Sequence, residues 1–193
     1  MLFTDESRFR ITRCDSRVRV YRRPGERYAA ATAQESRKIC RWSIMVWGGI
    51  SMDSRTDPVV IPGNLNANLY VDIVLGEHVV PVAYGIGPNF LLMQDNASPH
   101  TARITLDFLQ ELEIQTMVWP ALSPDLNPIE HVWDMLDRRV RGRPHPPQTI
   151  QQLTATLIEG WDAIPQEDLR RLLGSMPRRC NAVIRAMGAH TRY

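Results

Sequence analysis

The chain has 193 residues, of which 44% are apolar, and a formal net charge of +2. This length fits one compact domain with a buried core, and no run of about 18 apolar residues predicts a membrane span. The charged N-terminal segment argues against a secretory signal. Three widely spaced cysteines indicate neither a zinc site nor a disulfide framework, and they are Cys14, Cys40 and Cys180.

The first half of the chain predicts several strands and one long helix. Alternating residues indicate a strand over 2–11, which places Asp5 on the same face as Phe3 and Phe9. Further elements are expected as short strands at 18–21, 43–51 and 58–61, a polar loop over 22–38, and a helix from about residue 66 to 85 that Pro81 could interrupt.

The second half begins with the run FLLMQDN, residues 90–96, which predicts a strand buried on both faces with Asp95 at its carboxyl end. Ser98 and Pro99 then begin a helix, and residues 114–119 predict another strand. Helical spacing indicates helices from Pro128, from Ile150, and from Leu169 with a kink at Pro177. Strands first, then alternation, then helices predict an α/β domain with a mixed sheet and a helical C-terminal end.

Three acidic residues lie at positions suited to metal chemistry. Asp5 lies on a strand face, Asp95 ends a strand and Glu130 begins a helix. Their oxygens are the ligands that Mg²⁺ and Mn²⁺ prefer. Two such ions about 3.5–4 Å apart activate an attacking hydroxyl and neutralise the leaving oxygen in phosphodiester chemistry. We therefore expect these carboxylates to converge at one edge of the sheet.

Each of these acids also has a structural interpretation. Asp5 could face solvent at a strand edge, and Asp95 could be a turn residue. With Asn127 as N-cap, Glu130 would occupy the capping-box position of its helix. Two later acids on the same helix, Asp134 and Asp137, could replace Glu130 as a ligand.

Four segments carry a family resemblance: FTDESRF at 3–9, VWGGIS at 46–51, MQDNASPHTA at 93–102 and SPDLNPIEHVW at 123–133. Together they resemble the catalytic domain of the Tc/mariner superfamily of DDE transposases. Thirty-four residues separate Asp95 from Glu130, a spacing similar to that of the Tc-type branch. The likeness covers residues 1–142 well and the C-terminal helices less distinctively.

The resemblance implies a ribonuclease-H-like fold, in which helices flank a mixed five-stranded sheet. It implies that Asp5, Asp95 and Glu130 bind two Mg²⁺ or Mn²⁺ ions and catalyse DNA cleavage and strand transfer. The implied partners are transposon-end DNA, a TA target and a second copy in a homodimer, with no membrane, and the implied location is the nucleus. Residues 12–40 correspond to a loop through which protomers of relatives clasp each other.

The same resemblance sets the expected domain organisation. Residues 1–193 form a single catalytic domain, with a core over 1–142 and C-terminal helices over 143–193. The helix-turn-helix modules that precede this domain in the family are absent from the chain, so an N-terminal truncation is expected. An alternative function is therefore a truncated or domesticated, transposon-derived nucleic-acid-binding protein without transposition activity. A third is a nuclease that acts on RNA–DNA hybrids.

Several further residues are candidates for supporting roles. Asn96 could hold the Asp95 loop by hydrogen bonds, and His100 and His131 flank the acidic motifs, where they could lie near phosphate or make ordinary surface contacts. Helical spacing predicts that Trp133 packs in the core. A basic run is predicted to contact DNA phosphates, with solvated surface as the alternative, and comprises Arg138, Arg139, Arg141 and Arg143.

Overall fold

The structure is a computed structural model that describes residues 1–11 and 43–188. The strand predicted at 18–21, the loop predicted at 22–38 and the segment 12–40, expected from the resemblance to join protomers, lie outside the described residues.

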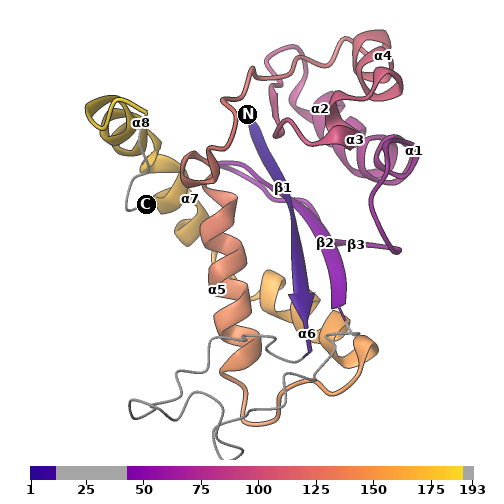
Figure 1. Cartoon of the computed structure of the whole chain (residues 1–193), viewed down its shortest axis with the longest axis vertical. Coiled ribbons are helices and arrows are strands. Elements are labelled where there is room, and N and C mark those ends of the chain that lie inside the picture. The colour runs from indigo at the N-terminus through magenta and orange to yellow at the C-terminus, as the bar shows by residue number, and fades with distance from the viewer. Residues whose placement is uncertain (12–42, 189–193) are drawn as a thin grey trace, which may run out of the picture.

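A mixed sheet with the strand order β3-β2-β1-β4 forms the centre of the fold (Figure 1). The long strands β1 (Leu2–Arg10) and β2 (Ser43–Ile50) pair antiparallel, and β3 (Val59–Ile61) pairs antiparallel to β2. The short strand β4 (Leu92–Met93) pairs parallel to β1.

The sheet of the described residues has four strands where five were expected. The segment predicted as a strand at 114–119 contributes only an isolated parallel bridge, between Thr116 and Leu92. Its neighbour in the sheet that the described residues form, β4, is two residues long, so the two segments cannot build a longer ladder.

A helical segment connects β3 to β4, and Asn66 begins it by accepting a hydrogen bond from the Leu69 N–H. It consists of α1 (Ala67–Leu69), η2 (Tyr70–Val79), which has π-type hydrogen bonding, and α2 (Val80–Ile86). Pro81 lies in the first turn of α2, so it does not interrupt the helical run. By length and composition alone, Ala67–Ile86 could cross a membrane, but its buried residues belong to the core cluster on one face of the sheet.

The remaining helices follow β4. They are α3 (Ser98–Thr101), α4 (Arg103–Glu111), the 3-10 turn η3 (Pro124–Leu126), α5 (Ile129–Arg141), α6 (Ile150–Asp162), α7 (Gln166–Gly174) and α8 (Met176–Arg185). The predicted helix after Ser98 is two helices because the Ala102 backbone is extended. The predicted last helix divides at Ser175, directly before Met176 and Pro177 begin α8.

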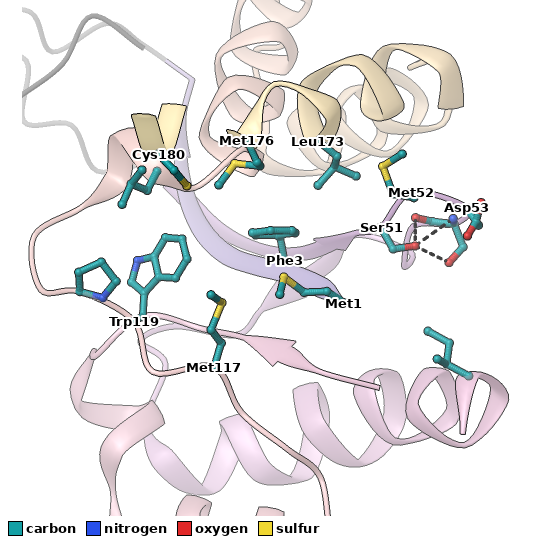
Figure 2. A pocket seen from close by; sticks show the side chains of 14 residues that line it. Met1, Phe3, Ser51, Met52, Asp53, Met117, Trp119, Leu173, Met176 and Cys180 are labelled. Carbon is teal, nitrogen blue, oxygen red and sulfur yellow. Dashed lines mark hydrogen bonds between the residues drawn. The ribbon is translucent and has the colours of Figure 1, made fainter. Parts of the chain in front are cut away.

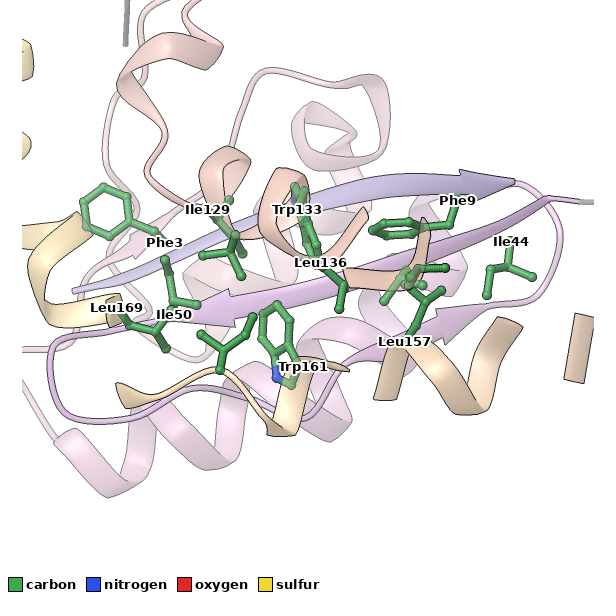
Figure 3. Close-up of a cluster of buried hydrophobic side chains, with 14 of the residues drawn as sticks. Phe3, Phe9, Ile44, Ile50, Ile129, Trp133, Leu136, Leu157, Trp161 and Leu169 are labelled. Carbon is green, nitrogen blue, oxygen red and sulfur yellow. The ribbon is translucent and has the colours of Figure 1, made fainter. Parts of the chain in front are cut away.

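Two apolar cores lie on opposite faces of the sheet because side chains alternate along β1 and β2. On one face, α5, α6 and α7 pack over Phe3 and Phe9 (Figure 3). Trp133 of α5 stacks on Trp161 of α6 with ring centroids 5.3 Å apart, so the predicted core packing of Trp133 is confirmed. On the other face, η2 and α4 pack over Leu2 and neighbouring residues.

Candidate metal centre

A pocket of about 480 Å³ contains all three carboxylates singled out by the sequence. Asp5 enters it from β1, Asp95 from the loop after β4, and Glu130 from the first turn of α5. The rest of the wall comes largely from residues 119–124. The structure therefore brings together three acids that lie far apart in the sequence.

Asp5 is the most strongly perturbed of these acids. Its Oδ2 accepts a hydrogen bond of 3.0 Å from Trp133 Nε1, which ties the strand to α5. Burial, and then the negative charges of Glu130 and Glu6, raise the pKa of Asp5 to about 8, against the lowering effect of the Trp133 N–H. At neutral pH this carboxyl group is therefore largely protonated in the absence of a cation.

The pKa of Asp95 is shifted in the opposite direction, below its usual value. Its Oδ1 accepts hydrogen bonds from the Ala97 N–H at 2.9 Å and from His100 Nδ1 at 2.7 Å. The His100 contact lowers the pKa of Asp95, burial opposes that shift, and the Ala97 N–H adds to it. Burial alone would lower the pKa of His100, but its contacts with Asp95 and Glu6 outweigh burial and raise that pKa to about 10. Asp95 is therefore held as a carboxylate.

Glu130 lies where α5 begins, and the loop before the helix is tied to β1. The Asn127 side-chain amide donates a hydrogen bond of 3.3 Å to the Thr4 carbonyl. Pro128 makes no capping hydrogen bond, and the Asn127 side-chain oxygen accepts one of 3.4 Å from the Ile129 N–H. Within the described residues the Asn127 N–H donates to the Pro124 carbonyl and not to the Glu130 carboxylate, as a capping box would require. Burial, then the charge of Asp95, raises the pKa of Glu130. The geometry favours the pocket position over the capping box.

The two alternative acids on α5 do not line the pocket. Asp134 pairs with Arg138 at 2.5 Å, and Asp137 pairs with Arg141 at 2.6 Å, each four residues further along the exposed side of the helix. Neither shares the environment of Glu130.

The predicted supporting residues are placed differently from one another. Asn96 lines the pocket, and its amide donates a hydrogen bond of 2.9 Å to the Trp119 carbonyl. His100 lies behind Asp95 and is buried. His131 does not line the pocket; burial, and then the neighbouring charge of Arg179, lowers its pKa.

All four arginines of the basic run have partners within the chain. Arg138 and Arg141 form the pairs already described, Arg143 lies 2.7 Å from Glu159, and Arg139 donates a hydrogen bond of 3.1 Å to the Gly160 carbonyl. Their charges are thus partly matched by nearby acids. Contact of this run with DNA phosphates stays a prediction.

The donor set fits hard divalent cations. Three acidic side chains with oxygen donors share one pocket, and the raised pKa values of Asp5 and Glu130 reflect burial and the repulsion between carboxylates that a cation would relieve. Within residues 1–11 and 43–188, however, no three His, Cys, Asp or Glu side chains already lie close enough together to hold an ion. Joint binding therefore requires the side chains to draw together around the cation.

A second, larger pocket of about 670 Å³ adjoins the carboxylate pocket and shares Trp119 and Pro120 with it. Figure 2 shows that apolar side chains line it, among them Phe3, Met117 and Met176. Asp53 is the one acid among its lining residues, so it offers no set of carboxylates that could share a metal ion. We therefore place the candidate metal centre in the smaller pocket.

Sequence reasoning missed two residues at the centre. Trp133 was predicted as a core residue, but its indole N–H also holds Asp5. Glu6 was not singled out, although its carboxylate lies 3.2 Å from His100 Nε2. Strand alternation places Glu6 and Asp5 on opposite faces of β1. That position indicates that the Glu6 carboxylate needs a polar partner among the elements packed on the second face, and this was the signal that could have identified Glu6.

The family profile described as "DDE superfamily endonuclease" matches residues 1–154. The chain belongs to this family. Among curated members, the Tcb1 transposase of Caenorhabditis briggsae is 35% identical over 193 residues, which cover 100% of this chain and 70% of the relative. The Tc1 transposase of Caenorhabditis elegans is 33% identical over 197 residues, with the same coverage.

Solved structures share the fold of this DDE superfamily chain. The Mos1 transposase catalytic domain with Raltegravir and Mg aligns with a TM-score of 0.68 at 20% identity, over 78% of each chain. The Mos1 mariner paired-end complex with Mn aligns with a TM-score of 0.75 at 20% identity, over 99% of this chain and 56% of that chain. The expected ribonuclease-H-like fold with a helical C-terminal end is thereby confirmed.

Proposed function

We propose that this chain is the catalytic domain of a Tc-type DDE transposase, which cleaves DNA strands and joins them to a target with divalent metal ions. The observation that carries the proposal is the meeting of Asp5, Asp95 and Glu130 in one pocket, from three separate elements. Family membership and the named transposase relatives support it.

In the proposed mechanism, Asp5, Asp95 and Glu130 hold two Mg²⁺ or Mn²⁺ ions. When bound, such ions activate the attacking hydroxyl and neutralise charge on the leaving oxygen. The chain's own residues prepare the ligands: Trp133 orients Asp5, and His100 keeps Asp95 ionised. Asn127 fixes the start of α5 against β1, which positions Glu130.

The proposed substrates are transposon-end DNA and a TA target, bound by a homodimer in the nucleus. Support for the DNA comes from the solved Mos1 complex with its left transposon end, whose fold this chain shares. If phosphate contacts dominate, DNA affinity falls steeply as salt rises. A salt-independent affinity would contradict this binding mode, and sedimentation with and without end DNA tests the dimer.

The alternative, a nucleic-acid-binding protein without transposition activity, is less favoured because all three carboxylates are present and share a pocket. Cleavage of RNA–DNA hybrids is a separate alternative. Hybrid cleavage is distinguished from the transposase assignment by measuring cleavage of an RNA–DNA hybrid and of duplex DNA side by side. Faster cleavage of the hybrid than of duplex DNA would contradict the transposase assignment.

The central experiment measures nicking of supercoiled plasmid in Mn²⁺. The wild-type chain is expected to nick, and Asp95→Ala and Glu130→Gln to lose at least about 100-fold in rate. Asp134→Asn is the matched control, because it removes an acid four residues further along the same helix but outside the pocket. Absence of metal-dependent nicking in the wild type, or equal loss in the control, would contradict the proposal.

A further inference from the structure

Behind the carboxylate pocket, one buried imidazole joins two acids from different elements. His100 of α3 lies with Nδ1 2.7 Å from Asp95 Oδ1 and Nε2 3.2 Å from Glu6 Oε1. Glu6 belongs to β1, where it directly follows Asp5. The contacts therefore run without a gap from the central strand to the loop that carries Asp95.

This ring has little freedom to turn. His100 is 2% exposed, and the Glu6 side chain is only 13% exposed. The Tyr70 ring packs against the imidazole at a centroid distance of 4.4 Å, and the Tyr70 hydroxyl donates to Gln94 at 2.6 Å. A buried ring that is contacted at both nitrogens and on one face keeps a single orientation.

The consequence is felt at Asp95, whose side chain is 49% exposed. Its Oδ1 accepts from both His100 and Ala97, and within the described residues no hydrogen bond reaches Oδ2. One oxygen is thus anchored while the other stays available. Metal-binding side chains depend on such outer contacts for their orientation, and loss of one typically weakens metal affinity about 10–100-fold.

We infer that Glu6 is a positioning residue, which orients Asp95 for metal binding by holding His100 in place. The inference rests on the proposed function, since it assumes that Asp95 binds the cation. It assigns separate tasks to two neighbouring residues of one strand. Asp5 faces the pocket directly, and Glu6 acts from the opposite face of the sheet through His100.

A purely structural role for Glu6 would have a different signature. A buried acid paired with histidine could stabilise the fold without any effect on the metal. The test therefore measures metal affinity and folding stability separately, by Mn²⁺ titration of the metal-free chain with detection of free Mn²⁺ by electron paramagnetic resonance, and by thermal unfolding.

Glu6→Ala is expected to weaken Mn²⁺ binding about 10–100-fold. Glu6→Met fills more of the space without offering an oxygen acceptor and should show the same loss of Mn²⁺ affinity. It replaces the alanine variant in the test if that variant folds poorly. Glu6→Gln keeps an acceptor for the imidazole N–H and is expected to restore affinity to within about 3-fold of the wild type. Asp107→Ala, which removes an acid from the exposed Arg103 pair on α4, is the control and should bind normally.

A double-mutant cycle tests whether Glu6 acts through His100. His100→Asn keeps an N–H donor near Asp95 but is too short to reach Glu6. In that background, Glu6→Ala should change Mn²⁺ affinity less than about 2-fold. Equal losses in both backgrounds, or unchanged affinity in every folded Glu6 variant, would overturn the inference.

The two proposals fail in distinguishable ways. If the wild-type chain shows no Mn²⁺ binding that Asp95→Ala removes, the proposed metal centre itself is wrong, and the role of Glu6 falls with it. If wild-type binding depends on Asp95 and the folded Glu6 variants bind equally well, only the positioning role is overturned.

Discussion

Two aspartates in one pocket have pKa shifts of opposite sign, and the difference follows from their contacts. Asp5 is buried beside other acids, whereas the carboxylate of Asp95 accepts hydrogen bonds from His100 and Ala97. In the absence of a cation, Asp95 is therefore ionised at neutral pH, whereas Asp5 is largely protonated. Binding of Mn²⁺ near neutral pH should consequently release a proton from Asp5.

The shift at Asp5 makes a prediction for stability. The folded chain binds this proton more tightly than the unfolded chain, because the pKa rises from 3.8 to about 8. The contribution of Asp5 to the free energy of unfolding therefore falls as pH rises from about 4 to about 8. Asp5→Asn removes this pH-dependent loss. The melting temperature of the metal-free variant minus that of the wild type should therefore be a few degrees larger at pH 8 than at pH 4. A difference in melting temperature that stays constant with pH would contradict the shift.

The indole of Trp133 is predicted to influence the metal as well as the core. Trp133→Phe removes the N–H that holds Asp5, so the pKa of Asp5 should rise further and Mn²⁺ affinity should fall several-fold. Trp161→Phe is the matched control, since it removes the partner ring's hydrogen bond to the Thr56 carbonyl, a bond that does not involve Asp5. Both variants should lose about 1–3 kcal/mol of stability. Equal Mn²⁺ affinities in titrations of the two variants would refute the specific role of Trp133.

At the scale of elements, long periodic segments were predictable and short ones were not. The strands at 2–11 and 43–51 and the helix after Pro128 form as the sequence indicates, because each buries a regular apolar face. The predicted strand at 90–96 shrinks to Leu92–Met93. Periodicity alone does not reveal how many neighbours a short apolar run will find.

Close packing between β2 and the helices predicts a costly substitution at Gly48. A Cβ added there would lie 2.8 Å from Trp161 Cη2 and 3.0 Å from Trp133 Cη2, so two stacked rings would have to move. Gly48→Ala should therefore cost about 1–3 kcal/mol in chemical denaturation. Gly85→Ala, within α2 and without any atom inside 4 Å, should instead stabilise by about 0.5–1 kcal/mol. A neutral Gly48 variant would contradict the packing.

At the scale of the whole molecule, the C-terminal helices complete the core around the site. Leu153, Leu157 and Trp161 of α6 share one apolar cluster with Phe9 and Trp133. Buried Arg179 of α8 donates a hydrogen bond of 3.1 Å to the Asp125 carbonyl, in the turn that leads to Glu130. The helices beyond residue 142 thus support the pocket from outside it.

Removal of residues 143–193 is accordingly predicted to abolish cooperative folding. The truncated chain would expose the Trp133 face of α5 and lose the apolar area buried against α6. Far-ultraviolet circular dichroism during thermal unfolding measures the effect, with the full chain as reference. A sharp transition near that of the full chain would show that residues 1–142 fold alone.

Metal chemistry suggested that the three acids converge, but only the family resemblance decided between that arrangement and the structural alternatives. Residue types and spacing placed Asp95 at a strand end, but they left all three acids with structural alternatives. The decision depends on how α5 crosses β1, which is set by contacts such as Asn127 with the Thr4 carbonyl, between residues 123 positions apart. No local pattern encodes such a contact.

The partition formed by Trp119 and Pro120 has a consequence for ligand design. Both pockets are lined by these two residues. A compound that binds the larger, apolar pocket and displaces them therefore also changes the shape of the carboxylate pocket. Thermodynamic linkage then requires the reverse effect, in which cations alter the affinity of that compound by the same factor. If the proposed metal centre binds magnesium, inhibitor screens on this chain would therefore give different hits with and without the ion, even for molecules that never contact a carboxylate.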